Sequence, residues 1–126
     1  MIAMATKTRI LIADDHAEVR AAVRDVILEF ADVEVVALTA DVAEAAEAAR
    51  AHQPDIAFVD AWLEGGGAEK AAALIKAVSP RTLIIALASA RDVETVLRLR
   101  AAGAAGCYEK EDLTDVLPEI LAGARR

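Results

Sequence analysis

Three aspartates, one serine and one lysine stand at the ends of apolar runs in this sequence, and their types suit phosphoryl chemistry with a metal ion. Asp14 and Asp15 follow ILIA, and Asp60 closes IAFVD. Ser89 follows LIIALA, and Lys110 follows GCYE. Neighbouring carboxylates repel one another unless a cation joins them, and Mg²⁺ prefers such oxygen ligands. A carboxylate can also attack a phosphoryl group while a metal ion and a lysine offset the charge of its oxygens.

The apolar runs predict the strands that would position these residues. We expect strands at residues 9–13, 33–39, 56–60, 83–88 and 105–109. The clearest runs are continuous rather than alternating, which is typical of strands covered on both faces of a parallel sheet. Segments with helical spacing lie between them. Alternating strands and helices with short connections predict an α/β fold, in which right-handed crossovers place helices on both faces of one sheet.

The helical segments carry more specific signals. Asp41 and Glu44 have the spacing of a capping box, which predicts a helix over 41–51. Pro118 falls inside the last apolar stripe and fits a helix best within its first turn, so we expect Thr114 to cap that helix. Two further stripes predict buried helix faces, namely Val19, Val23, Val26, Ile27 and Phe30, and Val93, Val96, Leu97 and Ala101.

The fold class brings the polar residues together. In an open parallel sheet, ligands bind beyond the carboxyl ends of the strands, where the strand order reverses. All five polar residues follow or close a predicted strand, so they collect at that edge. We interpret the two adjacent aspartates as residues that hold a metal ion at the end of the first strand.

Composition limits the classes of function. A chain of 126 residues fits one domain, and its formal net charge of −7 disfavours direct binding to nucleic-acid phosphates. We find no apolar run of membrane-spanning length and no signal peptide, so a cytoplasmic protein is expected. Cys107 is the single cysteine and cannot form an internal disulfide.

Four short motifs make the chain similar to a known family, the receiver domains of two-component response regulators. They are ADD at 13–15, FVD at 58–60, ALASA at 86–90 and YEK at 108–110. The resemblance extends from Ile10 to about Leu121. It implies a flavodoxin-like five-stranded parallel sheet of order 2-1-3-4-5, with residues 1–126 forming a single receiver domain.

The resemblance also implies a role for each site residue. Asp60 would accept a phosphoryl group from a histidine kinase or a phosphotransfer protein. Asp15, Asp60 and the backbone carbonyl of Trp62 would bind Mg²⁺ directly. Asp14 would act on Mg²⁺ mainly through water. Ser89 would turn toward the phosphoryl group after transfer, and Lys110 would pair with it.

The implied protein is a signalling domain and not an enzyme with an external substrate. It would assist its own phosphorylation and dephosphorylation, and the modification would shift two surface states. An output domain or another partner would meet the face formed by the fourth helix, the fifth strand and the last helix. A homodimer is left open, and no contact with a membrane is expected.

The chain departs from the family pattern in three places. Cys107 occupies a position that usually holds an aromatic residue, and Tyr108 should face the other side of the strand. Glu111 follows the lysine where many members have proline, so no cis peptide is expected there. The loop AWLEGGG has three glycines and could be unusually mobile. The bulk of Trp62 in that loop predicts slow self-dephosphorylation.

Other interpretations of these residues are less specific. Asp14 and Asp15 could simply cap the following helix. His16 fits a partly exposed residue at a helix start better than a phosphoacceptor, and His52 fits a favourable charge at a helix end. The side chains of Arg91, Arg98 and Arg100 are interpreted as a solvated face.

Two other functions remain open. A receiver that has lost phosphorylation could act as a docking or dimerisation module, which the Cys107 substitution and the altered loop would favour. A phosphatase of the haloacid dehalogenase type also uses an aspartate and Mg²⁺, but it expects a DxD pattern after its first strand, where this chain has ADDH. A flavin-binding protein is excluded, because no hydroxyl- and glycine-rich loop follows the first strand.

Overall fold

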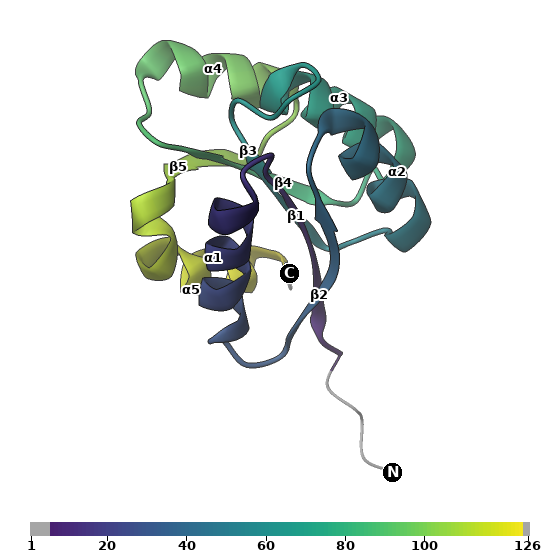
Figure 1. Cartoon of the computed structure of the whole chain (residues 1–126), viewed down its shortest axis with the longest axis vertical. Helices are drawn as coiled ribbons and strands as arrows, with labels where there is room; N and C mark the ends of the chain where they lie inside the picture. The colour runs from purple at the N-terminus through teal and green to yellow at the C-terminus, as the bar shows by residue number, and fades with distance from the viewer. Residues whose placement is uncertain (1–5, 125–126) are drawn as a thin grey trace.

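The five predicted strands form one parallel sheet. A computed structural model describes residues 6–124 and places the strands in the order β2-β1-β3-β4-β5 (Figure 1). The predicted fold class and strand order are confirmed, and each observed strand starts and ends within one residue of its prediction. The bounds are β1 Thr8–Ala13, β2 Val33–Thr39, β3 Ile56–Asp60, β4 Leu83–Ala88 and β5 Gly106–Glu109.

Five helices cover the two faces of the sheet. In Figure 1, α1 and α5 lie on one side, and α2, α3 and α4 lie on the other. A short 3-10 turn, η1 (Lys110–Asp112), leads directly into α5. No helix within residues 6–124 is long and apolar enough to span a membrane. The helix bounds are α1 Ala17–Leu28, α2 Val42–His52, α3 Gly67–Val78, α4 Val93–Ala102 and α5 Leu113–Ala124.

Alternation along the central strands sorts the core into two layers. Ile12, Phe58 and Leu87 pack with α1 and α5, whereas their chain neighbours pack with α2, α3 and α4. The second layer is rich in alanine, so its helices approach the sheet closely. The central strands β1, β3 and β4 are buried on both faces, which is why their sequences are almost continuously apolar.

The strand register aligns the carboxyl ends that carry polar residues. Ala13 pairs with Val59, and Asp60 pairs with Leu87 of β4. Ala88 in turn pairs with Glu109. The residues that follow β1, β3, β4 and β5 therefore lie along one edge of the sheet.

The predicted stripe of α4 does not form one buried face, although Val96 is partly buried and packs against the core. Val93 is 76% exposed and Leu97 is 62% exposed, whereas Thr95 and Leu99 are buried. The Asp92 side chain caps α4 by accepting a hydrogen bond from the Thr95 backbone N–H at 2.8 Å. This cap helps to turn the row of Thr95 and Leu99 toward the core and leaves the more apolar row outside.

The prediction that Thr114 caps the last helix is also wrong. The helix begins at Leu113, because η1 runs into it without a break, and Pro118 lies inside the helix rather than in its first turn. Proline has no N–H to donate to the carbonyl of Thr114. Both residues are exposed, so water can hydrate this carbonyl.

The capping signal of α2 is confirmed with one difference. The carboxylate of Asp41 accepts a hydrogen bond from the Glu44 N–H at 2.8 Å, as a capping box requires. The Glu44 carboxylate reaches back to the N–H of Ala40, one residue earlier than in the usual motif.

Candidate functional site

Two buried carboxylates share one ammonium group at the carboxyl edge of the sheet. Asp14 is 3% exposed and Asp60 is 6% exposed. The Nζ atom of Lys110 lies 2.8 Å from Asp14 Oδ2 and 2.8 Å from Asp60 Oδ1. Buried charges require such pairing, so the lysine joins the ends of β1, β3 and β5 into one site.

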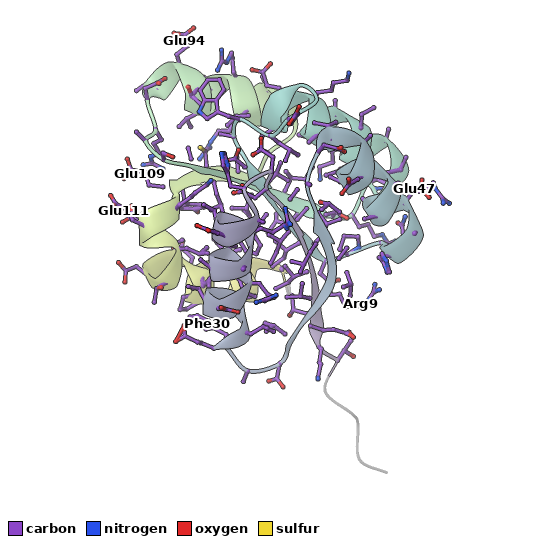
Figure 2. The ribbon with its side chains drawn as sticks, viewed as in Figure 1. Arg9, Phe30, Glu47, Glu94, Glu109 and Glu111 are labelled. Atoms are coloured by element: carbon purple, nitrogen blue, oxygen red, sulfur yellow. The ribbon has the colours of Figure 1, made fainter. Side chains whose placement is uncertain are left out.

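The surroundings of Lys110 keep it charged. Burial by itself would lower the pKa of Lys110, but hydrogen bonds and charge attraction from Asp14 and Asp60 outweigh it and raise that pKa above its ordinary value. Figure 2 shows Glu109 and Glu111, its two chain neighbours, at the outside of the molecule. The distances from its ammonium show that Lys110 is instead directed to the two aspartates. The site therefore contains a permanent positive charge beside Asp60.

Asp15 provides an oxygen without a hydrogen-bond donor. Its Oδ1 atom is buried and accepts no hydrogen bond from any residue between 6 and 124. The same atom lies 3.1 Å from Nδ1 of His16, which is also 3.4 Å from Asp14 Oδ1. Buried polar atoms without a partner are rare in proteins, and carboxylate oxygens are ligands of hard cations. The residues present thus fit a divalent cation.

The start of α1 fixes the geometry of this cluster. His16 is the N-cap residue in an extended conformation, and its side chain makes no capping hydrogen bond. Its backbone N–H donates to Asp14 Oδ1 at 2.8 Å, and Arg20 Nη1 donates to the Asp14 carbonyl at 2.7 Å. The interpretation of Asp14 and Asp15 as the N-cap of this helix is therefore wrong, because both precede the cap position.

The loop after Asp60 is held by backbone hydrogen bonds. The Ala61 N–H donates to the Leu87 carbonyl at 2.7 Å, and the Val42 N–H donates to the Glu64 carbonyl at 2.9 Å. The three glycines at 65–67 have φ values of 100°, 133° and 76°, which only glycine adopts readily. The shape of the loop therefore accounts for the glycine run.

Trp62 lies in this loop, two residues after Asp60. Its side chain is 68% exposed and lines a hollow between the loop and α4 with Gly66, Thr95 and Arg98. Trp62 therefore lies beside residues of α4.

Ser89 follows the end of β4 directly and is exposed. Within residues 6–124 its hydroxyl has no hydrogen-bond partner, so it is free to donate to a ligand.

Arg91 has a structural contact that the sequence did not indicate. Its Nη1 atom donates to the Cys107 carbonyl at 2.7 Å and ties the loop after Ser89 to β5. The three arginines of the predicted solvated face, Arg91, Arg98 and Arg100, are exposed, and the Nε atom of Arg98 also pairs with Glu69 Oε1 at 2.9 Å. A backbone carbonyl acceptor has no sequence signal, so the Arg91 contact could be found only in the structure.

The residues of β5 face opposite sides, as predicted. Cys107 is buried in the core layer of α2, α3 and α4, and Tyr108 packs against the layer of α1 and α5. Burial raises the pKa of the Cys107 thiol, although the nearby Arg91 charge acts in the other direction. The thiol is therefore protonated and unreactive at neutral pH.

Comparison with known proteins identifies the family. The model of the response regulator receiver domain matches residues 10–122. The chain belongs to this family. As a receiver domain, it has a general signalling role in two-component systems. The family model covers all of the residues that carry the site.

Curated relatives are longer than this chain. The oxygen regulatory protein NreC of Staphylococcus epidermidis is 34% identical over 99 residues, which are 78% of this chain and 45% of that protein. The probable transcriptional regulatory protein NarL of Mycobacterium tuberculosis is 28% identical over 120 residues, which are 94% of this chain and 56% of that protein. The chain thus spans about half the length of these relatives.

Solved receiver structures share the whole fold. The signal receiver domain of NarL from Mycobacterium tuberculosis has a TM-score of 0.89 at 27% identity and covers 96% of this chain and 98% of that one. A two-component response regulator of the LuxR family from Aurantimonas has a TM-score of 0.85 at 30% identity, over 94% of this chain and 87% of that one. The fold of residues 6–124 is therefore that of a receiver domain.

Proposed function

We propose that this receiver domain accepts a phosphoryl group on Asp60 from a histidine kinase or a phosphotransfer protein. The proposal is supported chiefly by the Lys110 ammonium, which contacts Asp60 and Asp14 at 2.8 Å in a buried site. This arrangement holds a nucleophilic carboxylate beside a charge that can compensate the phosphoryl oxygens. We further propose that residues 1–126 form one such domain.

Mg²⁺ is the cofactor that we propose for this transfer. Asp15, Asp60 and the backbone carbonyl of Trp62 would hold it directly, and Asp14 would act through water. The ion would offset the negative charge of the phosphoryl oxygens. The unpartnered Oδ1 atom of Asp15 supports this assignment, since it has no internal donor.

The transfer forms one bond and breaks one bond. A carboxylate oxygen of Asp60 attacks the phosphorus atom of a phosphohistidine, and the phosphorus–nitrogen bond breaks. The departing imidazole nitrogen keeps the electron pair and takes up a proton. Lys110 then pairs with the new phosphoryl oxygens, and the free hydroxyl of Ser89 donates a hydrogen bond to one of them.

The modified domain acts through its surface and not through turnover of an external substrate. The domain loses its phosphoryl group when water hydrolyses the acyl phosphate on Asp60, and the bulk of Trp62 slows this hydrolysis. Movement of Ser89 displaces the loop that Arg91 ties to β5, so the surface of α4, β5 and α5 changes. Val93 and Leu97 are exposed on α4, which supports this face as the one that meets an output domain or another partner.

The setting of the domain follows from its charge and its relatives. We propose a cytoplasmic location, where histidine kinases present their phosphoryl groups. The net charge of −7 disfavours direct contact with DNA, so any such contact would be made by another domain.

A second candidate is a receiver that docks without phosphorylation. The observation that favours it is Cys107, a small buried residue at the position where the family usually carries an aromatic side chain. The two candidates differ in whether acetyl phosphate changes the site.

Trp62 is the single tryptophan and reports on the site without a label. We expect a saturable change of its fluorescence on addition of Mg²⁺ and a further change on addition of acetyl phosphate. The second change should be absent in Asp60→Asn. A folded protein that responds to neither addition would support the docking module instead.

A further inference from the structure

His16 places an imidazole nitrogen beside the oxygens of the cation site. Its Nδ1 atom lies 3.1 Å from Asp15 Oδ1 and 3.4 Å from Asp14 Oδ1. One ligand atom from each of the three residues lies within 4.8 Å of the other two. The proposed transfer of a phosphoryl group to Asp60 does not use this imidazole.

The contact between His16 and Asp15 is close but is not a hydrogen bond. Asp15 Oδ1 is buried and accepts no hydrogen bond, although Nδ1 is 3.1 Å away. The ring nitrogen and the oxygen therefore do not point at one another. Two atoms that approach this closely without a hydrogen bond can both contact a cation that lies between them.

The separations match those of neighbouring ligands on one metal ion. Ligands about 2.0–2.2 Å from an ion, at the angles of an octahedron or a tetrahedron, are about 2.9–3.5 Å apart. The distances of 3.1 Å and 3.4 Å from Nδ1 fall in this range. Nδ1 of His16 and Oδ1 of Asp15 can thus be neighbouring ligands of one ion, with Asp14 acting on it through water.

Each oxygen of Asp14 has a different neighbour. Its Oδ2 atom is bound to Lys110 at 2.8 Å, whereas its Oδ1 atom faces His16. The lysine contact therefore does not involve the oxygen of Asp14 that faces His16.

The backbone of His16 is fixed while its ring stays accessible. The N–H of His16 donates to Asp14 Oδ1 and its carbonyl accepts from the Arg20 N–H, each at 2.8 Å. The imidazole is 71% exposed, so water molecules can complete a coordination shell on its outer side.

We propose that His16 is a ligand of this cation site and that it adds affinity for divalent ions that accept imidazole, such as Mn²⁺, Co²⁺ and Zn²⁺. Mg²⁺ prefers oxygen ligands and gives up water reluctantly, whereas imidazole suits the transition ions. The inference rests on the proposed function, because it uses the same aspartates. In this proposal, His16 determines how strongly the site prefers transition ions over Mg²⁺.

The test compares two ions in matched variants. Transition ions bind many sites more tightly than Mg²⁺, so the informative quantity is the change caused by removing His16. Co²⁺ and Mg²⁺ are titrated separately into the intact chain by calorimetry, and the visible spectrum of bound Co²⁺ is recorded. The variants are His16→Ala, His16→Asn and His52→Ala. His52, the other histidine, lies at the end of α2 and serves as the control.

His16→Ala should weaken Co²⁺ binding at least about tenfold, since loss of even an outer partner of a metal ligand costs about 10–100-fold. Its effect on Mg²⁺ should stay below about twofold, because the oxygen ligands remain. His16→Asn should behave likewise and keeps a residue favoured at an N-cap, so a loss of folding would not explain the result. The spectrum of bound Co²⁺ should change in both His16 variants. His52→Ala should alter the affinity for neither Co²⁺ nor Mg²⁺.

Equal losses for the two ions, or no loss for Co²⁺, would overturn the proposal. The proposed function fails by a different result, namely no phosphoryl group on Asp60 in the wild-type protein. Since Co²⁺ titration requires no phosphodonor, the two failures are distinguishable.

Discussion

At the scale of single residues, the site depends on the Lys110 ammonium. It lies 2.8 Å from each of two buried carboxylates, and it is the one cation within residues 6–124 that pairs with Asp60. Like charges that lose their counter-ion in a buried site repel one another and are poorly solvated. A divalent ion can partly replace the lysine, so stability and metal binding are coupled at this position.

Replacement of Lys110 by methionine should therefore destabilise the domain, and Mg²⁺ should restore part of the loss. We expect a decrease of about 1–3 kcal/mol in the free energy of unfolding, since a partly exposed pair costs less than a fully buried one. Urea denaturation with and without Mg²⁺ measures it. Lys70→Met is the control, because Lys70 is exposed on α3 and has no ion pair within the described residues. Equal effects of the two substitutions would contradict the account.

Trp62 gives a second prediction at the residue scale. It follows Asp60 by two residues, and the bulk of its indole should limit the approach of water to a phosphorylated Asp60. Trp62→Ala should speed the loss of the phosphoryl group by roughly fivefold, which corresponds to about 1 kcal/mol of barrier. Phosphoprotein decay after removal of the phosphodonor measures the rate. A half-life equal to that of the wild type would refute the shielding role.

At the scale of elements, α4 shows that hydrophobic periodicity alone does not predict which face of a helix is buried. Short continuous apolar runs such as LIIALA favour a buried strand, and this run coincides with β4. Helix α4 offers two rows that could face the core, and the row with more apolar residues is the exposed one. Tertiary packing and the Asp92 cap decide between them, and neither is visible in hydrophobic periodicity.

The Asp92 cap predicts how α4 responds to acid. The hydrogen bond from the Thr95 N–H, followed by that from the Thr95 hydroxyl, lowers the pKa of Asp92 below its ordinary value of 3.8. A carboxyl whose folded-state pKa is lowered stabilises the fold above its unfolded pKa, and this contribution is lost as the pH falls through the folded-state value. The start of α4 should therefore loosen only below about pH 3.8.

Carboxyl titration by NMR measures the Asp92 midpoint directly, with the Thr95 amide as a second reporter. In Asp92→Asn the amide should lose this transition and keep its cap, because asparagine is also favoured at the N-cap. A midpoint at or above the ordinary aspartate value would show that the cap does not form in solution.

At the scale of the whole molecule, the sheet explains why residues far apart in sequence form one site. Strand ends alone were sufficient to predict that Asp14, Asp60 and Lys110 lie at one edge. The pairing of one ammonium with two carboxylates was not predictable, since it depends on side-chain reach after the register is set. The bond from Arg91 to the Cys107 carbonyl and the approach of His16 to Asp15 were missed for the same reason.

Trapping the phosphoryl group on the chain shows whether Asp60 carries it. The protein is incubated with acetyl phosphate and Mg²⁺, the acyl phosphate is reduced with borohydride, and peptides are mapped by mass. Asp55→Asn, at the opposite end of β3, is the matched control for Asp60→Asn. If Asp60 is the phosphoacceptor, residue 60 alone is converted to homoserine, and only Asp60→Asn abolishes the conversion. Conversion at another aspartate, or none in a folded protein with Mg²⁺ bound, would contradict it.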